Sequence, residues 1–231
     1  AWIQNNYPDA KSTELGVYIL EDTKGEGGKV VKEDGYMFAE YTTTDLEGNI
    51  STYTNKETAK QLGKYDTTTY YGPKVSTTFK NTIQAGLADV VLGMRVGDRK
   101  KVVIPGWLMT YSSYGSAEEY IEKATSGSHT IYDITIKDFT DTIGSWEKQQ
   151  IQKYFEANRA EFGDMDTTKF VVMKAKESDA EETKFDGMYF KSTTKAEFAF
   201  TKDTTIYINY TGKLLNGLVF DTNKEKVAKD N

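Results

Sequence analysis

The sequence predicts an α+β fold, and two observations carry this prediction. In residues 79–105, apolar side chains first recur at helical spacing, and then a turn, a basic pair and a strand ending in Ile104-Pro105 follow. The other stretches up to residue 139 are rich in strand patterns, so this short helix stands alone among strands. A strand pattern begins again near residue 184, which indicates a second unit that stops early.

The predicted helix starts near Phe79 and is followed by a strand. Thr78, Asn81 and Thr82 offer capping side chains near its start, and Gly93 is a natural left-handed terminator. A tight turn over 96–98 then leads into a strand over 101–104. The apolar positions that share one face of the helix are Phe79, Ile83, Leu87, Val90, Val91 and Met94.

The remaining elements of the first unit are mostly strands. An N-terminal arm or helix end is expected over 1–15, residues 50–63 show no regular pattern, and residues 116–128 form a flap with a short helix over 117–124. Alternation places Met37 on the same face as Tyr41, and Tyr132 on the same face as Ile134. The predicted strands cover residues 15–20, 36–41, 65–73 and 129–139.

A helical linker is expected over 140–183. Ser145 can cap a helix that runs to about Phe162, where Gly163 would stop it. Residues 187–190 then repeat the pattern of 16–19, and Tyr210 and Gly217 repeat the spacing of Tyr41 and Gly48. The sequence therefore predicts two copies of one unit, the second covering 184–231 and incomplete.

Composition excludes several classes of function. A formal charge of −6 with interspersed acidic and basic residues argues against a nucleic-acid binder. The chain has no cysteine and one histidine, His129, so we expect neither disulfides nor a metal site. No apolar run is long enough for a transmembrane helix.

The helix, turn and strand of residues 79–105 resemble the FKBP-type peptidyl-prolyl cis-trans isomerases. This resemblance implies an antiparallel sheet wrapped around one short helix, with a divergent FKBP-like domain over 16–139 and the opening strands of a second one over 184–231. The residues that match the family pattern are Ile83, Gly86, Met94, Gly97, Arg99, Lys100, Ile104 and Pro105.

The resemblance also implies a set of pocket residues in the first copy. Tyr41 and Tyr132 correspond to aromatic residues that line the family's prolyl pocket. A loop tyrosine that reaches the bound peptide corresponds to Tyr114, with Tyr111 as the alternative because the loop is longer here. Ile83 matches an apolar pocket position. The alternative interpretation is that these side chains are simply core.

The first copy departs from the family at several positions, one of which is Gln84, where the family has an isoleucine whose backbone contacts the ligand. Leu87 stands where the family has the tryptophan at the base of the pocket. The family's Phe-Asp pair falls at Ile50-Ser51 or Ser51-Thr52, so its carboxylate is missing and Ile50 is the remaining apolar candidate. In the second copy, Tyr210 and the pair Phe220-Asp221 match the family, so we expect activity mainly there.

The function implied by the resemblance is a peptidyl-prolyl isomerase that helps exported proteins to fold. The alternative is a non-enzymatic chaperone or protein-binding module that kept the fold. Either would take proline-containing polypeptide clients, and the isomerase chemistry needs no cofactor and no metal. The Thr- and Tyr-rich, cysteine-free composition indicates a protein exported to the periplasm or outer membrane of a Gram-negative bacterium, with membrane tethering through a removed N-terminal segment as one option.

Overall fold

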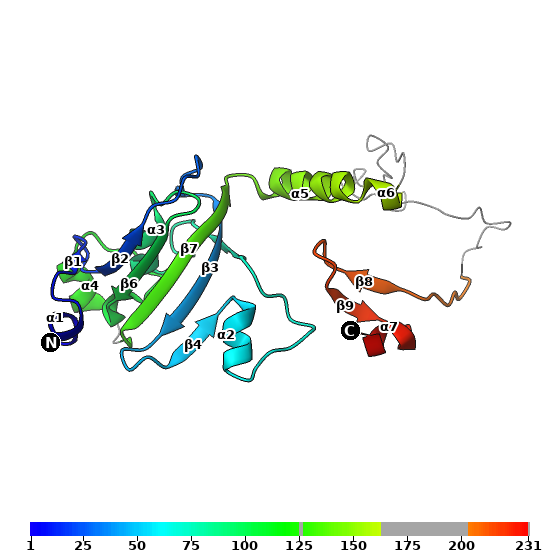
Figure 1. The fold of residues 1–231 in the computed structure, drawn as a ribbon. Coiled ribbons are helices and arrows are strands. Elements are labelled where there is room, and N and C mark those ends of the chain that lie inside the picture. The colour runs from blue at the N-terminus through cyan, green and yellow to red at the C-terminus, as the bar shows by residue number, and fades with distance from the viewer. Residues whose placement is uncertain (125–126, 163–202, 231) are drawn as a thin grey trace. The chain divides into compact units, whose positions relative to one another are not determined.

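A computed structural model of the chain describes residues 1–124, 127–162 and 203–230 (Figure 1). It divides into two compact units, Ala1–Ile143 and Gly144–Asn231. The predicted repeat over 187–190 and the predicted stop at Gly163 lie outside the described residues.

The first unit is built on an antiparallel sheet of seven strands, which confirms the predicted α+β class. Six strands follow the order β1-β2-β6-β7-β3-β4, and β5 pairs with the first half of β3. The long strands β3 and β7 run along the middle of the sheet (Figure 1). The strands are β1 (Lys11–Ser12), β2 (Tyr18–Thr23), β3 (Tyr36–Thr44), β4 (Ile50–Tyr53), β5 (Lys74–Thr77), β6 (Arg99–Ile104) and β7 (Thr130–Thr140).

The hydrophobic core lies between one face of this sheet and the helix α3 (Ala85–Val91). Val90 and Val91 of α3 pack with the inward side chains of β3, β6 and β7. Gly86 brings the helix close to the sheet, because a Cβ atom at this position would lie 2.3 Å from Cγ2 of Ile104. The absence of a side chain at Gly86 therefore sets how closely α3 approaches β6.

The predicted helix over 79–94 is wrong in its first part. Asn81 has a φ of 62°, a left-handed conformation that an α-helix cannot contain, so the chain turns before α3 begins. Gln84 precedes the helix and makes no capping hydrogen bond with its side chain, whereas Gly93 follows it with a φ of 86°, as expected of a terminator. None of the residues predicted as caps serves as the N-cap of α3: Thr78, Asn81 and Thr82.

Four further helices belong to the first unit. The helix α2 was not predicted, although Asn55 caps it by accepting a hydrogen bond from the backbone N–H of Thr58 at 2.7 Å. Ser116 caps α4 in the predicted flap in the same way. These helices are α1 (Trp2–Asn6), α2 (Lys56–Gln61), the 3₁₀ helix η1 (Gly106–Leu108) and α4 (Ala117–Lys123).

The strand predicted over 65–73 is wrong, because the strand β5 occupies Lys74–Thr77 instead. β5 pairs with Tyr36 to Ala39 of β3, whereas β4 pairs with Thr42 to Thr44. The same edge of β3 is therefore covered by two separate strands with a gap between them.

The face of the sheet opposite α3 carries a network of ion pairs. Arg99 donates two hydrogen bonds to Asp133, at 2.7 and 2.6 Å, and one to Glu21 at 2.7 Å. Lys101 lies 3.6 Å from the other carboxylate oxygen of Glu21. These contacts cross three neighbouring strands, β2, β6 and β7.

The carboxylate of Asp98 is buried in the turn before β6, and this residue is 2% exposed. Its two oxygens accept hydrogen bonds from the backbone N–H groups of Gly25 and Arg95, at 2.7 and 2.8 Å. Burial acts to raise its pKa, but these two backbone hydrogen bonds hold the pKa of Asp98 below its ordinary value. The carboxylate thus fastens the long loop after β2 to the start of β6.

The second unit contains the linker helix, a two-stranded hairpin and short helices. The predicted linker helix begins at Ile143, two residues before Ser145, and is divided at Asn158 into two helices. No helix in the described part of the chain is long and apolar enough to cross a bilayer. The elements are α5 (Ile143–Ala157), α6 (Arg159–Phe162), β8 (Thr211–Lys213), β9 (Val219–Thr222) and α7 (Glu225–Asp230).

Candidate functional site

A cavity of about 180 Å³ opens between α3 and the inner face of the sheet. Tyrosines and aliphatic side chains supply most of its walls, and short polar side chains complete one side. Five of the residues singled out in the sequence lie in this lining. The full lining is Met37, Tyr41, Ser76, Thr77, Thr82, Ile83, Gln84, Leu87, Tyr111, Tyr132 and Ile134.

Tyr41 and Tyr132 form one wall because β3 and β7 are neighbours. Tyr41 lies opposite Ile134 in the strand register, and Tyr132 lies opposite Thr43, so the two tyrosines are diagonal neighbours on one face. Their ring centroids are 6.2 Å apart with an interplanar angle of 39°. The predicted alternation of both strands therefore brings these two rings together.

The backbone of Tyr41 lies at the gap between β4 and β5, where no strand covers it. Thr54 fills this gap: its hydroxyl oxygen accepts from the N–H of Tyr41 at 3.0 Å, and its own N–H donates to the Tyr41 carbonyl at 3.0 Å. Thr54 is 2% exposed. A buried backbone N–H without a partner costs about 1–3 kcal/mol, so this threonine keeps Tyr41 in place.

The hydroxyl of Tyr132 has a raised pKa. Burial first, and then the nearby phenols of Tyr41 and Tyr111, raise the pKa of Tyr132 to about 12 from an ordinary value of 10.0. The group therefore remains a neutral hydrogen-bond donor at every physiological pH.

We expect Tyr132 to titrate well after the exposed tyrosines. The unfolded chain loses this proton near pH 10 and the folded chain near pH 12, so the contribution of Tyr132 to stability is complete below pH 10 and is lost as the pH rises through 12. NMR of chain labelled with ¹³C-tyrosine, compared with Tyr132→Phe for assignment, measures this directly. Ionisation of Tyr132 near pH 10 would contradict the geometry.

The loop after η1 contributes Tyr111 to the cavity, not Tyr114. Tyr114 instead packs its ring edge-to-face on the buried Tyr120 of α4, with centroids 5.0 Å apart. The Nζ atom of Lys123 lies 5.4 Å from the centre of the Tyr114 ring. Of the two loop tyrosines named from the sequence, Tyr114 therefore holds α4 to the loop and Tyr111, 56% exposed, lines the cavity.

Ile50 does not reach the cavity. It begins β4 and pairs with Thr44, beyond the point where the cavity meets β3. Ser51 and Thr52, the positions where the family carboxylate would fall, bond instead to the hydroxyl of Thr43. Within the described residues the lining contains no carboxylate.

Several lining residues were not among the candidates from the sequence. Met37 and Ile134 share faces with Tyr41 and Tyr132, so the alternation that was already recognised could have found them. Ser76 and Thr77 belong to β5, which the sequence placed too early. Only the pairing of β5 with β3 brings these two residues to the site.

In the second unit, Tyr210 and Asp221 lie side by side. The Tyr210 hydroxyl donates to a carboxylate oxygen of Asp221 at 2.8 Å, and this hydrogen bond raises the pKa of Tyr210. Phe220 is 58% exposed, and its ring lies over Gly212, where an added Cβ would be 2.7 Å away. The hairpin of β8 and β9 therefore brings two of the three candidate residues into contact.

No protein-family model matches the sequence. A search of curated proteins finds no match. Among solved structures, the chain is similar to FkpA from Escherichia coli, with a TM-score of 0.40 and 15% identity over 58% of this chain and 53% of that one. It is also similar to a peptidyl-prolyl cis-trans isomerase from Pseudomonas syringae pv. tomato, with a TM-score of 0.38 and 14% identity over 59% and 85%.

The matched region spans about half the length of FkpA. The similarity to FKBP-type isomerases is thus one of low identity over a little more than half of this chain.

Proposed function

We propose that the protein is a folding factor of the peptidyl-prolyl cis-trans isomerase type that acts on proline-containing segments of polypeptide clients. The observation that carries this proposal is the cavity lined by aliphatic side chains and by the rings of Tyr41, Tyr111 and Tyr132. Its volume is about 180 Å³. Because an apolar cavity of roughly 150 Å³ already holds a benzene ring, this space suits a prolyl ring.

Isomerisation of an X-Pro bond requires no reactive group from the protein. The barrier to rotation about a peptide bond is about 18–20 kcal/mol because the planar amide is conjugated, and both isomers of an X-Pro bond are accessible. A site that excludes water and binds the twisted amide better than the planar one lowers this barrier without a nucleophile, metal or cofactor.

Each part of the cavity has a role in this proposal. Ile83 and Leu87 hold the ring of the proline by apolar contact. The neutral hydroxyl of Tyr132 donates a hydrogen bond to a carbonyl next to the proline, and the raised pKa keeps this donor intact. Tyr41 supports Tyr132 from the neighbouring strand.

The proposal expects weak catalysis in the first unit. Its cavity carries no carboxylate among the described residues, and Leu87 offers a smaller wall than an indole ring. Tyr210, Phe220 and Asp221 are proposed as the corresponding residues of a second pocket. We further propose that the protein works outside the cytoplasm, in the periplasm or at the outer membrane, which its cysteine-free composition allows.

A proline-limited refolding assay with the whole 231-residue chain tests the proposal. We expect faster refolding. In a chain that also carries Asp221→Ala, we expect Tyr41→Ala to lower the remaining acceleration at least roughly tenfold, equivalent to about 1.4 kcal/mol. Asp221→Ala is the matched variant in the other unit. If the acceleration depends on Asp221 and not on Tyr41, the activity belongs to the second unit.

The second candidate is a binding module without catalysis, and the carboxylate-free lining favours it. In that case a proline-containing peptide binds at the cavity, with Tyr41→Ala weakening it, while refolding is not accelerated. If the peptide does not bind and refolding is not accelerated, both functions are excluded for this cavity.

A further inference from the structure

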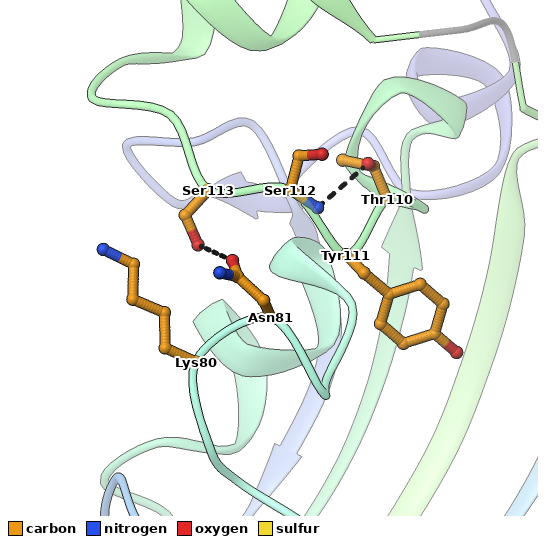
Figure 2. A pocket seen from close by; sticks show the side chains of 6 residues that line it. All are labelled: Lys80, Asn81, Thr110, Tyr111, Ser112 and Ser113. Carbon is orange, nitrogen blue, oxygen red and sulfur yellow. Dashed lines mark hydrogen bonds between the residues drawn. The ribbon is translucent and has the colours of Figure 1, made fainter.

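A second hollow lies on the other side of Tyr111, where the loop after η1 passes the turn before α3. Its volume is about 700 Å³, and its wall is polar. Figure 2 shows the Tyr111 ring pointing away from the polar side chains on the Lys80 side. The residues that line it are Lys80, Asn81, Thr110, Tyr111, Ser112 and Ser113.

The framework of this hollow is fixed by hydrogen bonds. The Ser113 hydroxyl donates to Oδ1 of Asn81 at 3.1 Å, and the N–H of Ser112 donates to Oγ1 of Thr110 at 3.2 Å (Figure 2). The carbonyl of Thr110 accepts from the N–H of Ala85 at 2.8 Å, which ties the loop to the start of α3.

Most of the polar groups in this wall that have no partner among the described residues are hydrogen-bond donors. Because Oδ1 of Asn81 is occupied by Ser113, its amide N–H groups are left for a ligand. Within the described part of the chain, the ammonium of Lys80 forms no ion pair and the hydroxyl of Ser112 forms no side-chain hydrogen bond. The wall contains a lysine but no carboxylate, so it favours an anion.

Further along the same loop, the carboxylate of Glu119 already has a backbone partner. Glu119 accepts a hydrogen bond from the N–H of Gly115 at 2.8 Å and does not line the hollow. The charge that a ligand meets in the hollow is therefore that of Lys80.

We propose that this hollow is a subsite for an acidic side chain of the client, close to the proline that occupies the tyrosine cavity. The inference rests on the proposed function and adds a preference for one class of sequence. Tyr111 lines both spaces, so a peptide whose proline sits in the tyrosine cavity can continue past this residue into the hollow. An extended chain advances about 3.3–3.6 Å per residue, so we place the acidic residue within a few positions of the proline.

Binding of short proline peptides to the whole chain tests this subsite. The peptides share one sequence and carry Glu, Gln or Lys at the positions flanking the proline, and binding is followed by calorimetry at low and high salt. We expect the Glu peptides to bind about threefold to fivefold more tightly than the Gln peptides, as for an exposed ion pair, with the difference shrinking in salt.

Two variants identify the residue responsible. Lys80→Glu is expected to abolish the preference for Glu and to favour the Lys peptides. Lys11→Glu makes the same change of charge on β1, at the far edge of the sheet from β5, and is expected to leave the preference unchanged.

The outcomes separate this inference from the function on which it rests. Equal binding of Glu, Gln and Lys peptides would overturn the subsite and leave the proline cavity standing. An equal effect of Lys11→Glu and Lys80→Glu would also overturn it, because the preference would then come from net charge. Failure of all peptides to bind would overturn the proposed function and the subsite together.

Discussion

Replacing Tyr132 with alanine is expected to weaken the binding of a proline-containing peptide by roughly thirtyfold or more, as for a central aromatic anchor at about 2 kcal/mol. Tyr132 contributes a wall of the cavity and a hydroxyl group that stays protonated up to a pH of about 12. Alanine removes both and also separates Tyr41 from its aromatic neighbour. The dissociation constant of one peptide, measured for the whole chain and the variant, gives the effect.

Two further variants divide this loss into its parts. Tyr132→Phe keeps the ring and removes only the hydroxyl, so we expect a loss of about 0.5–1.5 kcal/mol. Tyr18→Ala removes a ring of the same kind from β2, which is separated from β7 by β6 and does not line the cavity, and should leave binding unchanged. If Tyr18→Ala weakens binding as much as Tyr132→Ala, the loss reflects general destabilisation and the cavity is not the binding site.

Replacing Asp98 with alanine is expected to lower the free energy of unfolding of the first unit by about 3 kcal/mol. The change removes two hydrogen bonds to a charged acceptor and leaves the N–H groups of Gly25 and Arg95 without their partner. Urea unfolding of the whole chain, followed by the first unit's tryptophans, measures the loss. Asp22→Ala is the control, because Asp22 makes only an exposed ion pair with Lys24, and its loss should cost less than about 1 kcal/mol.

The lowered pKa of Asp98 also predicts how the stability of the first unit depends on pH. Since the folded-state pKa of Asp98 lies below its ordinary value of 3.8, its contribution is complete above that value and is lost as the pH falls through the lowered pKa. The difference in stability between the protein and Asp98→Ala should therefore shrink only below about pH 4. If the stability difference between the protein and Asp98→Ala stays constant down to pH 2, the negative charge of Asp98 does not contribute to the hydrogen bonds with Gly25 and Arg95.

Five of the eleven residues that line the cavity were named from the sequence, through the family resemblance, and local patterns explain why they lie together. Alternation grouped Tyr41 with Met37 and Tyr132 with Ile134, because a strand's side chains point to opposite faces with a period of two. Helical spacing paired Ile83 with Leu87, and both line the cavity although Ile83 precedes α3. The turn before the helix keeps Ile83 on the same side.

The supporting contacts could not be predicted, because they depend on pairings distant in sequence. Asp98 and Gly25 are 73 residues apart, and neither residue type indicates the other. Thr54 bonds to Tyr41 only because β4 and β5 leave a gap along β3, and the position of β5 was itself predicted wrongly. The choice between Tyr111 and Tyr114 depended on the packing of Tyr114 on Tyr120.

The ion pairs of Arg99, Asp133 and Glu21 have a consequence for a protein proposed to work among unfolded chains. Unfolded chains bind to exposed apolar surface and form hydrogen bonds with exposed sheet edges. Paired charges cover part of the face opposite α3, while the other face carries the tyrosine cavity. For the proposed function, we therefore expect a client to bind on the cavity side of the sheet and not over the ion pairs of Arg99.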